Sequence, residues 1–223
     1  MAESISIEDV KTLYTARLNT YRAFISFFRS QAGIEALLQS SQLLRPRLRV
    51  LDAGAGFGTV TFALLEALRQ RNIEPHVIDA FDLTPAMLEQ FKAELAARDI
   101  TLVRVEQANV LALEQLPPSW SDYDVIVSAS MLEYLAKRDL SRALLALRNR
   151  LVRNGTLLAV VTRKNWMTKV LIEQWWRAER YTRQELREAI AAAGFRDVSF
   201  RKFPARYFWL NTSNHVVVAR CDE

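Results

Sequence analysis

The chain has 223 residues, half of them hydrophobic and a quarter charged, with a formal net charge of +5 at pH 7. This length fits one domain with a sizeable core, and the absence of an uncharged apolar run of about 18 residues argues against a membrane span. The single cysteine, Cys221, cannot build a disulfide framework or a cysteine metal site, and residues 1–8 lack the apolar core of a signal peptide. We therefore expect a cytoplasmic protein without a metal.

The charge is unevenly distributed along the chain. Residues 1–139 hold 14 Lys and Arg against 18 Asp and Glu, whereas residues 140–223 hold 16 against 7. A basic C-terminal third can attract an anionic substrate, a nucleic acid or an acidic lipid surface. The other interpretation is a solvated basic surface without a partner.

Residues 1–45 are predicted to form a helical arm that precedes a domain at residues 46–223. Apolar residues recur at three- and four-residue steps in the first part of this arm, which predicts an amphipathic helix. Gly33 is expected to break the arm and to start a second helix at residues 34–44, which Pro46 ends. The arm either packs on the sheet or covers the ligand as a lid, in which Tyr14 and Tyr21 reach the site.

From residue 48 onward, apolar segments of strand length alternate with helical patterns, which predicts a parallel sheet with helices on both faces. The predicted strands are residues 49–52, 76–81, 101–106, 123–128, 156–162, 198–203 and 215–219. The predicted helices are residues 60–70, a helix opening at Thr84 and Pro85, residues 139–152, and residues 182–194 with a capping box. Asn154 and Gly155 are predicted to form a turn.

A glycine-rich turn, Asp52-Ala53-Gly54-Ala55-Gly56-Phe57-Gly58, joins the first strand to the first helix of this pattern. Such a turn brings bare backbone close to a nucleotide-like ligand, because a Cβ would block the ligand or the dihedral angles of the turn. A dinucleotide fingerprint would require a glycine at position 59, where this chain has Thr59. A nicotinamide oxidoreductase is therefore disfavoured.

The spacing D-x-G-x-G-x-G resembles motif I of class I S-adenosylmethionine-dependent methyltransferases. The string Asp82-Leu83-Thr84-Pro85-Ala86-Met87-Leu88 resembles motif II of small-molecule methyltransferases of the ubiquinone and menaquinone type. This resemblance implies a Rossmann-like, doubly wound α/β fold with a seven-stranded sheet, mostly parallel with strand seven antiparallel. A helical lid at the N-terminus would complete the fold.

The resemblance implies S-adenosyl-L-methionine as cofactor and S-adenosyl-L-homocysteine as product. Asp82 would accept hydrogen bonds from the ribose hydroxyls, with Asp79 as a rival inside the strand. Asn109 stands where this family usually has an acid that binds the adenine amino group, and its amide can accept the same bond. The predicted cofactor-binding residues are Asp52, Gly54, Ala55, Gly56, Asp82, Leu83, Met87, Asn109, Val110, Ser128 and Met131.

The implied reaction is an in-line displacement in which an acceptor atom attacks the sulfonium methyl group. A base is needed only if that atom carries a proton of high pKa. Glu133 and His215 are the catalytic candidates, although a glutamate at a helix start can also simply face water. Trp166, Tyr207 and Trp209 are predicted to line the substrate pocket, and the alternative is that these aromatic rings close the core.

The sequence therefore predicts methyl transfer to a small molecule. At the place where enzymes that methylate exocyclic amines of bases carry [D/N/S]-P-P-[Y/F], this chain reads Ser128-Ala129-Ser130-Met131. A methyltransferase acting on RNA or protein through the basic, aromatic-rich C-terminal third is the first alternative. A non-catalytic S-adenosylmethionine-binding partner subunit is the second, and the oligomeric state is left open.

Overall fold

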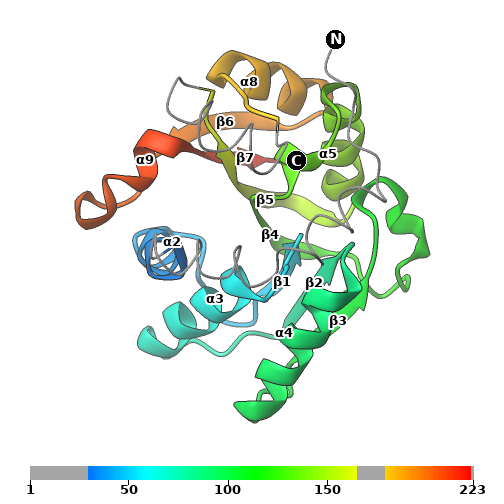
Figure 1. Cartoon of the computed structure of the whole chain (residues 1–223), viewed down its shortest axis with the longest axis vertical. Coiled ribbons are helices and arrows are strands. Elements are labelled where there is room, and N and C mark those ends of the chain that lie inside the picture. Colours follow the sequence, from blue (N-terminus) through cyan, green and yellow to red (C-terminus); the bar gives the residue numbers. More distant parts are fainter. Residues whose placement is uncertain (1–29, 165–178, 222–223) are drawn as a thin grey trace.

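The computed structural model describes residues 30–164 and 179–221, and its centre is one seven-stranded sheet (Figure 1). The strands follow the spatial order β3-β2-β1-β4-β5-β7-β6. Their bounds are β1 Arg49–Ala53, β2 Val77–Asp82, β3 Val103–Gln107, β4 Tyr123–Ala129, β5 Leu151–Thr162, β6 Arg196–Arg201 and β7 Asn214–Arg220.

The first five strands pair in parallel, and β7 is antiparallel to both of its neighbours, β5 and β6. The predicted fold class, a doubly wound sheet with strand seven antiparallel, is therefore confirmed. Because β7 runs against the others, it begins at the edge where β1, β2, β4 and β5 end. We call this edge the carboxyl edge of the sheet.

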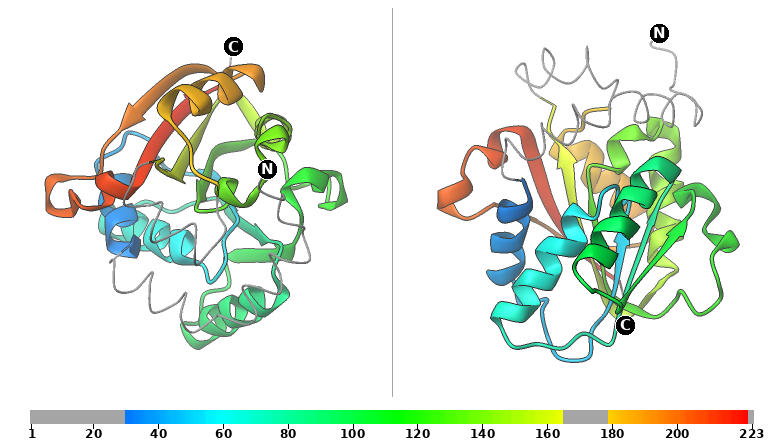
Figure 2. Two further views of the ribbon diagram at one scale, coloured as in Figure 1. Left: turned by 45° about the horizontal axis from the view of Figure 1, so that its top comes forward. Right: turned by 60° about the horizontal axis from the view of Figure 1, so that its bottom comes forward.

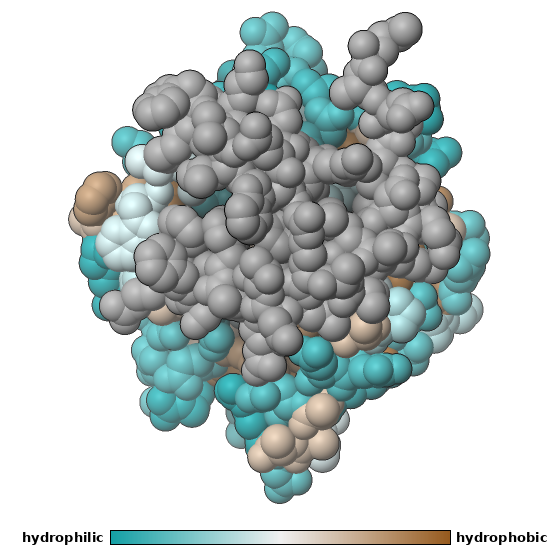
Figure 3. All heavy atoms as spheres, in the orientation of Figure 1, coloured by the Kyte–Doolittle hydropathy of each residue, from teal (hydrophilic) through white to brown (hydrophobic). Residues whose placement is uncertain are grey.

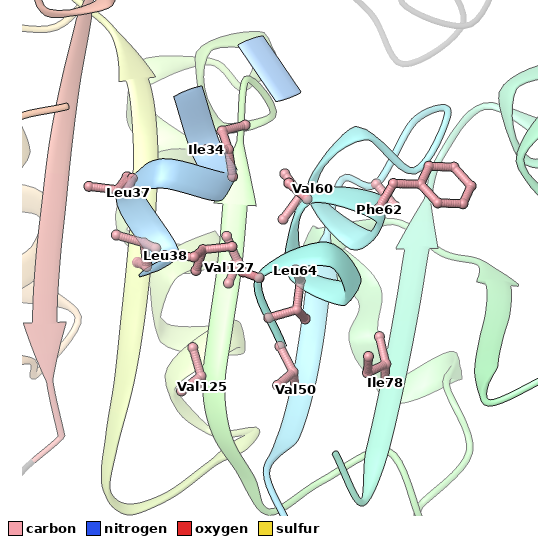
Figure 4. Close-up of a cluster of buried hydrophobic side chains, with 14 of the residues drawn as sticks. Ile34, Leu37, Leu38, Val50, Val60, Phe62, Leu64, Ile78, Val125 and Val127 are labelled. Atoms are coloured by element: carbon pink, nitrogen blue, oxygen red, sulfur yellow. The ribbon is translucent and has the colours of Figure 1, made fainter. Parts of the chain in front are cut away.

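Helices cover both faces of the sheet, with α2, α3 and α4 on one side and α5 and α8 on the other (Figures 1 and 2). Their bounds are α2 Ser30–Gln39, α3 Thr59–Gln70, α4 Pro85–Ala97, α5 Leu140–Arg148, α8 Arg183–Ala192 and α9 Leu210–Ser213. Figure 4 shows the core on the first side, where side chains of α2 and α3 point toward valines of β1 and β4.

The helix predicted at residues 34–44 begins earlier and ends earlier, as α2 Ser30–Gln39, and contains Gly33. The prediction that Gly33 breaks a helix is wrong. A Cβ at this position would lie 2.2 Å from Leu210 Cδ1, so the glycine allows α9 to approach the helix closely. Leu37 and Leu38 are buried in the shared core beneath it.

Other boundaries also differ from prediction, most of all between α5 and β5. The helix expected at residues 139–152 ends at Arg148, and β5 already begins at Leu151. The turn predicted at Asn154 and Gly155 is an irregularity inside β5, because the pairing with β4 shifts between Tyr123 and Val125. Asn154 adopts a left-handed φ of 59°, which is typical of a bulged strand.

Local signals of the other elements are confirmed. Helix α4 starts at Pro85, and α8 has a reciprocal capping box between Thr182 and Glu185. The loop predicted before the last strand contains the short 3-10 helix η5 Ala205–Tyr207 and α9. None of the described helices is long and apolar enough to cross a membrane.

The arm predicted as a lid at residues 1–45 is described only from residue 30 onward. Tyr14, Tyr21 and Trp166 lie outside the described residues. Their roles stay predictions.

Candidate cofactor-binding site

The glycine turn has the backbone conformation that its sequence predicts. Gly54, Gly56 and Gly58 have φ values of +78°, +54° and +82°, in the left-handed region that favours glycine. The amides of Gly54 and Ala55 both donate to the carbonyl oxygen of Phe81 in β2, at 2.9 Å. The turn is thereby fixed to the end of the neighbouring strand.

Only one of these glycines, Gly56, has room for a Cβ without a close contact. A Cβ on Gly54 would lie 2.4 Å from Cβ of Met131, and one on Gly58 would lie 2.1 Å from the ring of Phe91. The nearest atom to a Cβ on Gly56 is Met87 Sδ, at an ordinary 3.5 Å. Two glycines therefore serve packing within the protein, and Gly56 alone leaves room for a ligand at the turn.

Asp52 is fully buried at the end of β1. Its Oδ2 accepts hydrogen bonds from the amide of Thr61 at 3.0 Å and from its hydroxyl at 2.7 Å. Its Oδ1 has no partner in the described part of the chain, and burial raises the pKa of this carboxyl to about 7. An unpaired buried carboxylate oxygen suits a cationic group such as an ammonium.

Asp82 joins the end of β2 to the glycine turn. Its Oδ2 accepts from the Gly56 amide at 2.9 Å, and its Oδ1 accepts from the Thr84 amide at 2.8 Å. Burial raises the pKa of this carboxyl, while these backbone bonds act in the opposite direction. Each oxygen keeps a second lone pair, so the carboxylate can still accept from a pair of hydroxyls.

The rival acid, Asp79, is occupied within the sheet. Arg104 donates to both of its carboxylate oxygens at 2.6 and 2.7 Å, and the hydroxyl of Tyr123 donates to Oδ2 at 2.6 Å. Burial, with Asp79 beside it, raises the pKa of Tyr123. The structure therefore favours Asp82 over Asp79 as the acid open to a ligand.

Asn109 follows β3 and caps the 3-10 helix η1 Val110–Gln115, because its Oδ1 accepts from the Leu111 amide at 3.0 Å. Among the described residues its Nδ2 has no partner, so its amide offers a free donor in addition to the shared oxygen. Val110 and Met87 are buried, and Leu83 is half-buried. These apolar side chains belong to the elements that follow β2 and β3.

Ser128 and Met131 lie at the end of β4. The Ser128 hydroxyl is buried and unpartnered within the described chain, and Met131 packs on Gly54. The predicted cofactor residues thus come from the ends of four adjacent strands, β1, β2, β3 and β4, at the carboxyl edge. Thr61, which holds Asp52, was missed, because a threonine in a helix carries no distinctive signal.

Glu133 lies in the 3-10 turn η2 Leu132–Tyr134 and is 2% exposed, so the alternative of a glutamate facing water is wrong. The Thr162 hydroxyl, at the end of β5, donates to its Oε1 at 2.7 Å. Its Oε2 is buried without a partner among the described residues, and burial raises its pKa to about 7. The backbone amide of Glu179 also donates to the backbone carbonyl oxygen of Glu133, at 2.6 Å.

His215 lies near the start of β7 on the side of the sheet that α8 covers. Its Nε2 is 3.2 Å from the Tyr181 carbonyl oxygen, and its ring meets Phe200 edge-on at 5.9 Å. Burial and the nearby charge of Arg163 lower its pKa to about 4, which leaves the ring neutral at pH 7. A neutral ring that bonds a carbonyl carries its proton on Nε2, which leaves Nδ1 as a buried acceptor.

The rings of Tyr207 and Trp209 are packed against other side chains and do not project freely into a pocket. Tyr207 is 7% exposed and belongs to the core shared with α2, and Trp209 packs against the same cluster. Their rings meet edge-on at 5.6 Å. The alternative that these aromatics close the core is therefore the better description of Tyr207, since tertiary packing covers its ring.

Comparisons with known sequences identify relatives. Residues 51–157 match the family model described as a methyltransferase domain. The chain is 24% identical over 173 residues to 2-methyl-6-phytyl-1,4-hydroquinone methyltransferase 2 of Oryza sativa subsp. japonica, covering 77% of this chain and 45% of the relative. It is 29% identical over 166 residues to 5-methylorsellinic acid synthase of Aspergillus terreus, covering 69% and 6%. The chain thus spans less than half the length of these curated relatives.

Solved structures share the fold. Magnesium protoporphyrin IX methyltransferase from Synechocystis PCC 6803 with bound SAH superimposes with a TM-score of 0.72 at 15% identity, covering 97% of this chain and all of that one. PigF with SAH gives a TM-score of 0.74 at 17% identity, covering 98% and 63%. Residues 51–157 therefore match a methyltransferase domain, and the chain shares its fold with these solved structures.

Proposed function

We propose that this chain transfers a methyl group from S-adenosylmethionine to a small-molecule acceptor and releases S-adenosylhomocysteine. The observation that carries the proposal is the arrangement at the carboxyl edge, where Asp82 accepts a hydrogen bond from the Gly56 amide. Gly56 is the one glycine of the turn that leaves room for a ligand. The neighbouring strand ends add Asp52, with a buried oxygen, and Asn109, with an amide donor, and neither atom has a partner among the described residues. Bound S-adenosylmethionine supplies an activated methyl group.

The ribose, the adenine and the ammonium group of the cofactor each have a suitable partner in this proposal. Asp82 binds the ribose hydroxyls through its remaining lone pairs, and Asn109 donates to a ring nitrogen of adenine above the apolar surface of Val110. Asp52 Oδ1 accepts from the ammonium of the methionine part, directly or through water. These roles use acceptor lone pairs and an amide donor that the described residues leave available, so binding would add hydrogen bonds at the site.

Similarity to relatives supports a small-molecule acceptor. Those relatives are named for a hydroquinone, magnesium protoporphyrin IX and 5-methylorsellinic acid. All three molecules carry aromatic or conjugated rings. We infer an acceptor of comparable size, with a hydroxyl, carboxyl or activated carbon as the methyl-accepting atom.

Glu133 is the residue that we propose as general base for acceptors whose nucleophile carries a proton. Thr162 occupies Oε1, so Oε2 is the atom left to take a proton. A carboxyl whose pKa is raised to about 7 is a stronger base than an ordinary glutamate and is still partly ionised at neutral pH. His215 is the weaker candidate, because its ring faces Tyr181 and Phe200 on the α8 side.

Calorimetry with S-adenosylmethionine and S-adenosylhomocysteine tests the cofactor site. Removing the Asp82 carboxylate in Asp82→Ala should weaken binding about 100-fold, since hydrogen bonds to a charged group contribute about 1.5–3 kcal/mol each. Glu74→Ala, an exposed acid at the opposite edge, is the matched control and should bind normally. No binding to the wild type would contradict the proposal. Binding without turnover on hydroquinone, porphyrin and polyketide acceptors would favour the non-catalytic subunit.

A further inference from the structure

The connection between β6 and β7, residues 202–213, lies on the carboxyl edge of the sheet. Strand β6 is antiparallel to β7 and therefore ends at the edge where β7 begins, the edge that carries the glycine turn. The connection contains η5 and α9 and stands out from the side of the molecule next to α2 (Figures 1 and 2). It is therefore placed to touch a surface that approaches the mouth of the site.

One phenylalanine side chain of this connection is exposed to solvent. Phe208 is 66% exposed, more than Leu102 and Leu145, which are the other exposed large hydrophobic residues in the described part of the chain. Its ring packs edge-on against Trp209, with centroids 5.7 Å apart. In Figure 3, hydrophobic atoms appear beside hydrophilic ones at the left edge, where Figure 1 shows this segment.

The exposure of Phe208 is fixed by buried anchors on both sides of it. Tyr207 and Leu210 are 7% and 4% exposed and pack in the core. The side chain of Asn211 accepts from the Phe203 amide at 2.8 Å and donates to the Phe203 carbonyl at 3.2 Å. The connection is therefore folded, and its outermost aromatic ring is directed outward by the packing of its neighbours.

The surroundings of this ring are positively charged. Arg201, Lys202 and Arg206 are exposed, and residues 201–213 contain no Asp or Glu. Within the described residues, none of these three cations forms an ion pair. Arg206 lies over the Tyr207 ring at 5.1 Å. An exposed apolar ring is thus combined with cations that form no ion pair with an acid of the described residues.

We propose that this surface docks the domain onto an anionic lipid membrane. Cationic side chains gain energy near acidic headgroups, and aromatic rings settle at the boundary between headgroups and acyl chains. A nucleic acid would also attract the cations, but a phenyl ring without a polar group gains most from the acyl boundary. The docking is independent of methyl transfer, and it would turn the carboxyl edge toward the membrane.

Sedimentation of the full chain with vesicles tests the proposal. Binding to vesicles of phosphatidylcholine and phosphatidylglycerol in equal parts should exceed binding to phosphatidylcholine alone by about tenfold and should weaken with salt. Phe208→Ser and Arg206→Glu should each lower the partition coefficient by about fivefold or more. Lys202→Glu should do the same and is the second charge variant if Arg206→Glu fails to fold.

Matched controls are Leu102→Ser and Arg153→Glu, which make the same changes at exposed positions on the opposite edge. Both should sediment with anionic vesicles as the wild type does. Equal binding to neutral and anionic vesicles, or equal losses in the controls, would overturn the proposal. So would a titration in which the same variants lose affinity for an RNA oligonucleotide while vesicle binding is unchanged. Calorimetry with S-adenosylmethionine on each variant shows whether the substitution also changes cofactor binding.

Discussion

The two halves of the carboxyl edge are built differently. On the β1–β2 side, Asp52 and Asp82 accept from backbone amides of the turn or helix that directly follows a strand. On the β4–β5 side, Glu133 bonds Thr162 on another strand, and His215 approaches the Tyr181 carbonyl. The first half combines contacts that are local in sequence, Asp52 with Thr61 and Asp82 with Thr84, with the bond from Gly56 to Asp82 between two strand ends. The contacts of the second half all join segments that are distant in sequence. In our proposal, the first half binds the cofactor and the second half acts on the acceptor.

The largest expected effect is on turnover, in the second half. With an acceptor that carries a hydroxyl proton, Glu133→Gln should lower kcat about 100-fold or more, because general base catalysis contributes about 10²–10⁴-fold. The affinity for S-adenosylmethionine should stay unchanged. Wild-type kcat should rise with pH through about 7, the raised pKa of Glu133, and the variant should lose this dependence.

Glu114→Gln, at an exposed glutamate in η1, is the control for that variant and should keep the wild-type pH profile. An unchanged kcat in Glu133→Gln would remove Glu133 as the base. The same outcome would also weaken the division between the two halves of the edge.

In the first half, the glycine turn is tested by stability. Gly58→Ala should reduce the free energy of unfolding by about 2–4 kcal/mol, because a Cβ meets the Phe91 ring and φ is +82°. Adding Phe91→Leu should recover part of this loss and leave the cost of the left-handed backbone. The comparison is the double variant Gly33→Ala with Leu210→Ala. Gly33 lies in a helix, and the second change removes the side chain that a Cβ at Gly33 would meet. Chemical denaturation that shows no loss for Gly58→Ala would contradict the packing role.

The buried Asp52 carboxyl predicts a pH dependence of stability. Its pKa is raised from 3.8 to about 7, so the folded state binds the proton more tightly than the unfolded chain. This contribution is present below about pH 4 and is lost as pH rises through about 7. As pH rises between these values, the free energy of unfolding of Asp52→Asn should therefore increase relative to that of the wild type by roughly 1 kcal/mol per pH unit. Urea unfolding measures this difference. Parallel pH profiles of stability for the two proteins would show that burial does not shift the pKa of Asp52.

The smallest expected effect is at the surface. Lys137 bridges Glu185 at 2.7 Å, but both side chains are partly exposed, at 44% and 35%. Lys137→Ala should lower the free energy of unfolding by about 0.5 kcal/mol, and salt should reduce the difference. A loss above about 2 kcal/mol would mean that this contact contributes more than an exposed ion pair.

The succession of strands and helices, the glycine turn, the start of α4 at Pro85 and the capping box of Thr182 and Glu185 could be predicted from the sequence. These features depend on residues close together in the chain, where dihedral preferences and hydrogen bonds within a turn decide the structure. Asp82 could be predicted as a site residue for the same reason, because it directly ends a strand.

The burial of individual side chains became clear only from the folded chain. It buried Glu133 against Thr162, placed Tyr207 in the core with α2, and kept Gly33 inside a helix so that Leu210 could approach. It also assigned Gly54 and Gly58 to packing and left Gly56 open. Burial depends on partners far away in sequence, and no local pattern carries that information.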